Sequence, residues 1–244
     1  MIGMLKRIYR RQAFNPSLIG VLINPFFVSR KGLYKCLSDN AHLVTGSVLD
    51  LGCGQKPYKE LFSYSDYTGL EIDTDLNRKL AFADDFYDGN TLPYQDNLFD
   101  TILCNQVLEH VFEPDFFLSE IFRALKPGGL IILTVPFIWE EHEQPYDFGR
   151  YTSFGLDYSF RKSGFEVVNI EKITFGASAI LQLFAGFLFS KVIHRGFIFR
   201  SLFIALLISP ISFLGFLFTL RGQQNKSKNQ NLYLDQLIVG RKPK

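Results

Sequence analysis

This chain of 244 residues has little of what disulfide frameworks and metal sites are built from. Its three cysteines, Cys36, Cys53 and Cys104, form no C-x-x-C pair and leave one over, which argues against a disulfide framework and favours a reducing compartment. The four histidines lie far apart in the sequence, without cysteine or carboxylate partners at ligand spacing. No metal site is therefore predicted.

Acidic residues are missing from the first 35 positions, which carry a net charge of +7. Residues 36–190 carry −13 and residues 191–244 carry +8, which together give the formal +2 of the chain. An acidic middle argues against nucleic acid as the partner of the central region, and the basic ends favour contact with something anionic. Alternatively, the basic residues at the two ends bind no partner and simply form a solvated surface.

The basic start of the chain also has apolar residues at helical spacing, from Ile2 to Tyr9. Residues 1–45 are accordingly predicted to form basic amphipathic N-terminal helices, a pattern typical of segments that lie on a membrane surface. A signal peptide is the competing interpretation, because Leu18–Val28 is mostly apolar. Asn24 and Pro25 interrupt that run and no small-residue cleavage site follows it, so we reject a signal peptide.

A glycine turn follows the first predicted strand. Val48–Leu51 has buried-strand character and runs into Gly52 and Gly54, with Pro57 suited to the first position of a helix. Glycine accepts positive φ and lets a ligand approach the backbone, and open α/β sheets bind cofactors at such strand ends. Asp50 lies at the mouth of this turn, where its carboxylate could receive a cationic ligand.

Strands and helices alternate after this turn, as in an α/β sheet. The further predicted strands are residues 67–71, 84–86, 99–104, 130–135, 166–170 and 232–239. The predicted helices are residues 31–44, a helix capped by Asp115 and stopped at 126–129, and residues 152–163 closed by Gly164.

A glycine turn fits two classes of cofactor, the dinucleotides and other adenine-bearing molecules. The dinucleotide fingerprint needs a third glycine where this chain has Pro57, whereas Glu71, 19 residues beyond Gly52, could hold a ribose diol in either class. Asp50 and Asp88 suit a ligand that brings a positive charge and an adenine amine. Structural roles remain open for the three acids, as a strand-end cap or as ordinary turn residues.

Six segments share an order and spacing that resemble class I S-adenosylmethionine (SAM)-dependent methyltransferases of the type 11 kind, over about residues 46–172. The segments are Leu49–Gly54, Gly69–Glu71, Asp88–Pro93, Phe99–Asp100, Leu108–Val111 and Leu125–Gly129. The resemblance implies an α/β fold with a Rossmann-like, seven-stranded, mostly parallel sheet that binds SAM across the ends of its first four strands.

The resemblance also implies which residues hold SAM. They divide between the methionine part (Asp50, Gly52, Cys53, Gly54), the ribose (Glu71), the adenine (Asp88, Gly89) and the methionyl end (Asn105, Gln106). Lys56 departs from the pattern, because many members have a third glycine at this position.

Methyl transfer requires mainly that the nucleophile is held in line with the methyl group. A general base is needed only if the acceptor must lose a proton. His142, after the fifth predicted strand, is the predicted base, with His110 as second candidate. Asp147, Arg150 and Tyr151 are predicted to shape the acceptor pocket. Alternatively, Asp147 and Arg150 simply pair and fix this loop.

An apolar insertion, residues 173–231, separates the domain's two parts, residues 46–172 and 232–244. Ile173–Ser190 and Ser201–Leu220 lack charge, and the second is long enough to cross a bilayer. A single crossing would separate the last strand from its sheet, and a full hairpin would carry basic residues across. Two helices that lie in the cytoplasmic leaflet keep the last strand with its sheet and carry no basic residues across the bilayer. Pro210 could break the second of these helices. Alternatively, the helices cover the domain's own core or a dimer partner.

Taken together, these features predict a SAM-dependent methyltransferase at the cytoplasmic membrane face. The expected acceptor is an oxygen or nitrogen of a small molecule, a lipid or a lipid-linked sugar, and no nucleic acid partner is expected. Two alternatives remain. One is a non-catalytic SAM-binding partner protein at the membrane, and the other, disfavoured by Pro57 and the acids, is an NAD-dependent oxidoreductase.

Overall fold

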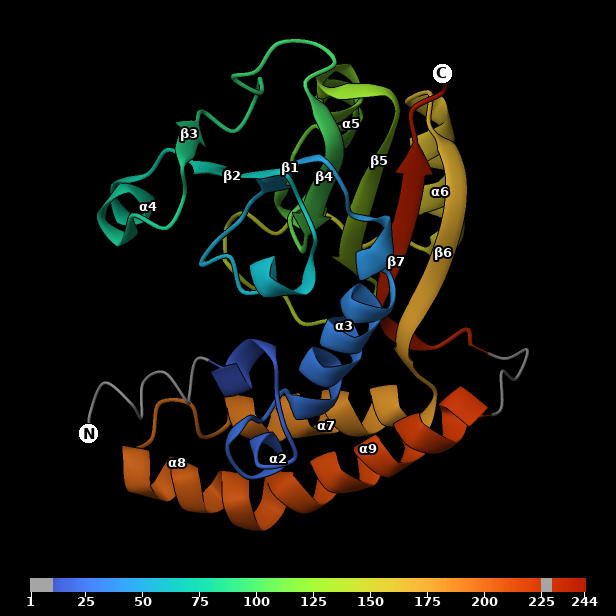
Figure 1. Ribbon diagram of the computed structural model, residues 1–244. Helices are drawn as coiled ribbons and strands as arrows, with labels where there is room; N and C mark the ends of the chain where they lie inside the picture. Colours follow the sequence, from blue (N-terminus) through green and yellow to red (C-terminus); the bar gives the residue numbers. More distant parts are fainter. Residues whose placement is uncertain (1–10, 225–229) are drawn as a thin grey trace. The chain divides into compact units, whose positions relative to one another are not determined.

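The computed structural model describes residues 11–224 and 230–244. Within them, seven strands form one sheet in the order β3-β2-β1-β4-β5-β7-β6 (Figure 1). The strands are β1 (Ser47–Leu51), β2 (Asp66–Ile72), β3 (Asp85–Tyr87), β4 (Phe99–Asn105), β5 (Leu125–Pro136), β6 (Glu166–Phe175) and β7 (Tyr233–Arg241). The predicted Rossmann-like α/β fold is confirmed, and each predicted strand is present with its ends shifted by a few residues.

The strand order changes direction beside β1. The pairs β1–β2, β2–β3, β1–β4 and β4–β5 are all parallel, so these five strands end at the same edge of the sheet. From β1 the chain builds outwards to β2 and β3 and then returns to place β4 on the other side. Open α/β sheets bind ligands at this kind of switch point, outside the carboxyl ends of the strands.

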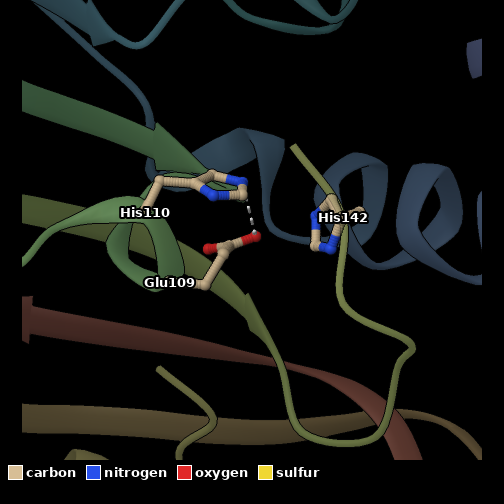
Figure 2. A group of neighbouring side chains, drawn as sticks. All are labelled: Glu109, His110 and His142. Carbon is tan, nitrogen blue, oxygen red and sulfur yellow. Dashed lines mark ion pairs between the residues drawn. The ribbon is translucent and has the colours of Figure 1, made fainter. Parts of the chain in front are cut away.

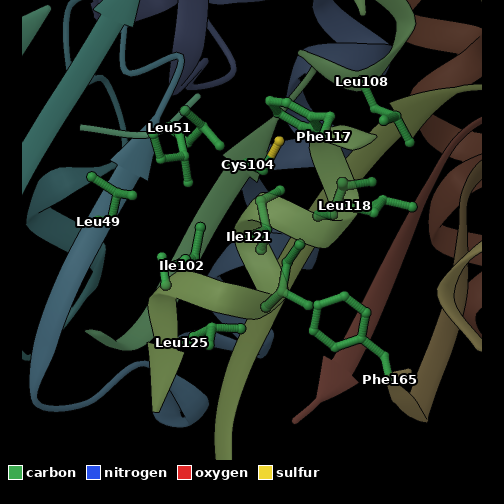
Figure 3. Packing of buried hydrophobic residues seen from close by; sticks show 14 of the residues in the cluster. Leu49, Leu51, Ile102, Cys104, Leu108, Phe117, Leu118, Ile121, Leu125 and Phe165 are labelled. Carbon is green, nitrogen blue, oxygen red and sulfur yellow. The ribbon is translucent and has the colours of Figure 1, made fainter. Parts of the chain in front are cut away.

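One face of the sheet's central strands buries an apolar cluster that includes Leu49, Leu51, Ile102 and Cys104 (Figure 3). Helix α5 (Pro114–Ala124) contributes Phe117, Leu118 and Ile121, whose spacing of three and four residues puts them on one helix face. Its start differs from the prediction. Pro114 occupies the first turn, and Asp115 pairs with Lys162 (2.6 Å) instead of capping the helix.

Helix α6 (Ser153–Lys162) follows its sequence signals closely. The Thr152 hydroxyl accepts from the Gly155 N–H as an N-cap, and Gly164 ends the segment with φ +94°. The helix predicted over 31–44 is less regular. It runs as α3 (Phe27–Asp39), followed by a short 3₁₀ turn, η1 (Ala41–Leu43). A short helix that we did not predict, α4 (Asp75–Leu80), follows β2.

The chain divides into two compact units. The sheet unit comprises Leu37–Glu171 with Gln236–Lys244, and the helical unit comprises residues 1–36 with Lys172–Asp235. The domain boundaries predicted at 45, 172 and 231 stay a prediction. Much of the predicted N-terminal amphipathic pattern lies in residues 1–10, outside the described residues, as do the basic residues Lys226 and Lys228.

The helical unit packs its helices through buried polar contacts. It contains α2 (Gly20–Ile23), α7 (Ala177–Ser190), α8 (Phe197–Phe203), a π-helical turn η4 (Ile204–Ile208) and α9 (Ser209–Gln224). Helices α7 and α9 lie side by side (Figure 1). The buried Gln182 side chain accepts from the Val28 N–H (3.0 Å) and donates to the Pro25 carbonyl (3.0 Å). One face of α7 is thereby fixed against the start of α3.

Pro210 does not break the second apolar helix, contrary to the prediction. Residues Phe197–Gly222 form one helix of 26 residues. The irregularity lies just before the proline, in the π-helical turn η4. Proline removes one backbone N–H from the i→i−4 pattern, and a local change of hydrogen-bond spacing lets the helix continue. The Ser209 N–H donates to the Ile204 carbonyl five residues earlier, the spacing of a π-helical turn.

Candidate active site

The glycine turn after β1 is tied to the end of β2. The N–H groups of Gly52 and Cys53 both donate to the Leu70 carbonyl (2.9 and 3.2 Å). Gly52 has φ +70°, and a Cβ there would lie 2.4 Å from Val107, so only glycine fits. Gly54 has φ +48°, and a Cβ there would meet nothing within 4 Å. The backbone at Gly54 therefore faces open space in which a ligand can lie.

The predicted helix start at Pro57 is wrong. The chain makes only a 3₁₀ turn there, η2 (Lys59–Leu61), with Tyr58 preceding it. Lys56 has φ +53°, a conformation that favours glycine and explains why glycine is common at this position in the family it resembles. Its side chain lies across Gly69 and pairs with Asp84 (2.5 Å). The ion pair with Asp84 therefore holds the Lys56 side chain beside β2, the strand that contains Gly69.

Asp50, at the end of β1, is a buried carboxyl group. Its Oδ2 accepts a hydrogen bond from the Tyr67 hydroxyl at 2.5 Å. Burial raises the pKa of Asp50 to about 6, although the Tyr67 hydrogen bond and the charge of Lys56 both act to lower it. A cationic ligand next to Asp50 would favour its charged form and lower this pKa.

The remaining residues at the ends of β1 and β2 are arranged around the same turn. The Cys53 thiol is buried, and burial with nearby acidic groups raises its pKa to about 12, so it stays protonated at neutral pH. Only the Cys53 backbone is therefore suited to contact a cofactor. Glu71 closes the turn from β2, because its Oε2 accepts from the Gly54 N–H at 2.9 Å.

The ends of β3 and β4 carry the other predicted cofactor residues. Asp88 follows β3 and accepts from the Asn90 N–H (2.9 Å), a contact that lowers the pKa of Asp88 and shapes the turn in which Gly89 takes φ +87°. After β4, Asn105 accepts from the Thr134 hydroxyl (3.3 Å), and the Gln106 N–H donates to the Thr134 carbonyl (2.9 Å). The predicted cofactor residues thus all lie at or just after strand ends on one edge.

The loop after β5 is fixed by an internal ion pair. Arg150 contacts both carboxylate oxygens of Asp147 (2.5 and 2.7 Å), and the His142 N–H donates to the same carboxylate (2.9 Å). Hydrogen bonding from Arg150 is the main reason why the pKa of Asp147 is lowered to about 2. Asp147 and Arg150 therefore pair as the structural alternative describes. Tyr151 is half-buried, and its carbonyl accepts from Gln236 (2.6 Å).

The two histidines proposed as bases lie together. His110 and His142 have ring centroids 4.9 Å apart, and Glu109 adds a fully buried carboxylate beside them (Figure 2). The expectation that the histidines lack nearby carboxylates is wrong for this pair. Sequence separation concealed the contact, although both segments follow neighbouring strands, β4 and β5. Glu109 was not singled out, although it lies inside the Leu108–Val111 segment.

This arrangement fits SAM. The ligand joins a positively charged sulfonium amino acid to adenosine, so it needs an acid near the methionine part and acceptors for the ribose. The buried Asp50 carboxyl, the open face of Gly54 and the Glu71 carboxylate beside it meet those needs. Bound SAM supplies an already activated methyl group.

The sheet order and this strand-end site define a class I SAM-dependent methyltransferase domain. Residues 49–133 match the family described as Methyltransferase domain. A ubiquinone biosynthesis O-methyltransferase of Psychrobacter arcticus is 32% identical over 101 residues, which cover 36% of this chain and 39% of the relative. The chain spans about two-fifths of the length of such curated relatives.

Solved structures with this fold carry different activities. The [4+2]-cyclase SpnF has a TM-score of 0.56 with 23% identity, over 86% of this chain and 80% of that one. Phosphoethanolamine N-methyltransferase 2 of Haemonchus contortus, in complex with SAM, has a TM-score of 0.54 with 16% identity, over 97% of this chain and 60% of that one. These structures share the fold of the chain, and residues 49–133 carry its match to the methyltransferase domain family.

Proposed function

We propose that this protein transfers a methyl group from SAM to an oxygen or nitrogen of a small-molecule, lipid or lipid-linked sugar acceptor at a membrane surface. The observation that carries the catalytic part is the strand-end site, in which Asp50, Glu71 and the open face of Gly54 lie at one edge of the sheet. In this proposal, Asp88 and Gly89 hold the adenine, and Asn105 and Gln106 contact the methionyl end.

The protein's own contribution to the reaction is mainly orientation. Holding the acceptor atom in line with the methyl group removes much of the barrier, since effective molarities of oriented groups reach about 10⁵ M or more. An acceptor hydroxyl or ammonium group must also lose a proton. In the proposal, His142 accepts it, because its side chain is partly exposed and follows β5, at the same sheet edge as the cofactor residues. Tyr151 lines the acceptor pocket.

Turnover is tested with isotopically labelled SAM and a membrane lipid extract. We expect label to appear in an extractable product, whose mass spectrum identifies the acceptor, and S-adenosylhomocysteine to form in equal amount. SAM binding without transfer to any lipid or aqueous extract would instead favour the non-catalytic partner protein. Binding of NAD and not of SAM would favour the oxidoreductase.

The membrane part of the proposal rests on the outer surface of the helical unit. Phe197 and Leu206 are 74% and 71% exposed, and several further large apolar side chains on α7, α8 and α9 are about half exposed or more. Only 28% of the most apolar window of helix 197–222 is buried, unlike the core helix of a soluble domain. The opposite helix faces are already packed, through the cluster of Ala185, Ile204 and Ile208. The exposed faces therefore need another apolar partner, for which we propose a bilayer.

The path of the insertion favours helices lying in one leaflet. The Gly176 N–H donates to the Leu232 carbonyl at 2.8 Å, so the segment leaves and rejoins the sheet at the same place. A single crossing would separate these two residues. Lys191, Arg195 and Arg221 are exposed near the helix ends, where each can interact with anionic headgroups at about 1 kcal/mol. We accordingly propose a peripheral or monotopic position on the cytoplasmic face.

Membrane binding is tested by flotation of the full chain with anionic vesicles of phosphatidylcholine and phosphatidylserine. Phe197→Glu combined with Leu206→Glu should reduce the bound fraction at least tenfold, since burying such a side chain contributes roughly 1.5–3 kcal/mol. Phe154→Glu is the matched control, because Phe154 is equally apolar and 85% exposed but lies on α6 in the sheet unit. Equal loss in both variants, or a wild-type protein that is monodisperse without detergent and ignores vesicles, would contradict membrane binding.

A further inference from the structure

Three side chains with metal-binding atoms converge at the ends of β4 and β5. Glu109 and His110 belong to the 3₁₀ turn η3 (Leu108–His110) that follows β4, and His142 comes from the loop after β5. One ligand atom of each lies within 4.8 Å of the others, and Figure 2 shows the side chains gathered around one point. All three belong to the sheet unit.

Hydrogen bonds fix the orientation of both imidazole rings. The Nδ1 atom of His110 lies 2.8 Å from the Tyr146 carbonyl oxygen, and Nδ1 of His142 lies 3.3 Å from the Glu140 carbonyl and 3.2 Å from the Asp147 carboxylate. These partners can only accept hydrogen bonds, so Nδ1 carries the proton in each ring. Histidines that bind metals through Nε2 are commonly oriented in this way, with Nδ1–H in contact with an oxygen.

The charges around the two rings favour a cation. The Glu109 carboxylate is fully buried, with Oε1 3.9 Å from Nε2 of His110, and the Glu143 carboxylate approaches the same nitrogen to 4.0 Å. Asp147 adds a third carboxylate, against the single guanidinium of Arg150. These three carboxylates outnumber the guanidinium by two. A cation placed among these carboxylates is attracted by all three of them.

We propose that Glu109, His110 and His142 bind one divalent transition-metal ion, with zinc as the probe. Two imidazole nitrogens and one carboxylate form a three-ligand set that leaves positions open for a further ligand. Zinc bonds of about 2.0–2.2 Å put tetrahedral ligand atoms about 3.4 Å apart, so side-chain rotation must shorten separations that now range from 3.9 Å up to 4.8 Å. The ion's binding does not require the proposed methyl transfer, but a His142 side chain that coordinates the ion cannot also be the base of that reaction.

The test is zinc binding by the untagged full-length protein after removal of metals with a chelator. Isothermal titration and elemental analysis after dialysis should give one zinc per chain. His110→Ala and His142→Ala should each weaken zinc binding by about 100-fold or more. Asp147→Asn, which affects only the partner of the His142 Nδ1, should weaken it by about 10- to 100-fold.

His42→Ala is the matched control, because His42 lies in the same unit on η1, outside the cluster. SAM binding is measured on every variant as a check of folding that does not depend on zinc. Loss of zinc in the cluster variants, with SAM binding and the control unchanged, supports the site. A wild-type protein that takes up no zinc, or zinc uptake unaffected by His142→Ala, overturns it and leaves His142 available as a base. Absence of SAM binding in a zinc-binding wild type would instead contradict the proposed function alone.

Discussion

Asp50→Asn should stabilise the protein without ligand and weaken its binding of SAM. The Asp50 carboxyl is buried and its pKa is raised from 3.8 to about 6, so the folded protein holds this proton more tightly than the unfolded chain does. Below pH 4 both states are protonated and the residue contributes equally to both. As the pH rises from about 4 to 6, the unfolded chain ionises first and stability falls; above about pH 6 the loss is complete.

The size of this loss follows from the shift of about two pKa units, at 1.36 kcal/mol each, and is about 3 kcal/mol at neutral pH. Asparagine has nearly the same shape, keeps an oxygen that can accept from Tyr67, and does not ionise. The variant should therefore gain up to about 3 kcal/mol over the wild type at pH 7.5 and nothing near pH 4. It also loses the charge that meets the SAM cation, which should weaken SAM binding roughly tenfold or more.

Urea unfolding of both proteins at several pH values measures the first effect, and calorimetric titration with SAM measures the second. The free energy of unfolding at pH 7.5 must be higher in the variant than in the wild type, whereas the affinity for SAM must be lower. A variant that is less stable than the wild type at pH 7.5, or a stability difference that does not change between pH 4 and 7.5, would refute the argument from burial. Unchanged SAM affinity would remove Asp50 from the cofactor site.

Three further predictions concern the sheet unit. Glu71→Gln should weaken SAM binding roughly tenfold in calorimetry, because a charged acceptor becomes neutral, whereas Glu60→Gln on the 3₁₀ turn η2 should leave it unchanged. His142→Ala should lower turnover of the identified acceptor by about 10² to 10⁴ with little change in SAM affinity, and unchanged turnover would exclude His142 as the base. Asp147→Asn should lower the free energy of unfolding by about 1–3 kcal/mol at pH 7, as it breaks the pair with Arg150. Because the pKa of Asp147 is lowered to about 2, the pair's stabilisation is present above about pH 4 and is lost as the pH falls towards 2, so the difference between wild type and variant should shrink in acid.

Local sequence signals predicted much of the sheet unit. The Thr152 cap, the closing Gly164 and the apolar face of α5 depend on residues a few positions apart, and the structure has each of them. The predicted helix starts were less accurate where they involve residues that are distant in the sequence. Asp115 looks like a cap but pairs with Lys162, 47 residues away, and Pro57 precedes a 3₁₀ turn instead of a helix, next to a Lys56 that is held by Asp84.

The site was only partly predictable for the same reason. Asp50, Gly54 and Glu71 could be placed together because parallel strands end at one edge, and the alternation of strands and helices in the sequence already implies parallel strands. The grouping of Glu109, His110 and His142 depends on the path of a loop that Asp147 and Arg150 fix, and no local periodicity encodes that path. In the helical unit, the uncharged runs predicted helices, but not the seam of Ala185, Ile204 and Ile208 that decides which faces are exposed.

Calorimetric titration of the full-length protein with SAM, and separately with NAD, tests the central claim most directly. The strand-end site predicts that SAM binds with one molecule per chain, that its affinity falls as Asp50 is protonated below about pH 6, and that NAD does not bind. Binding of NAD without binding of SAM would contradict the assignment.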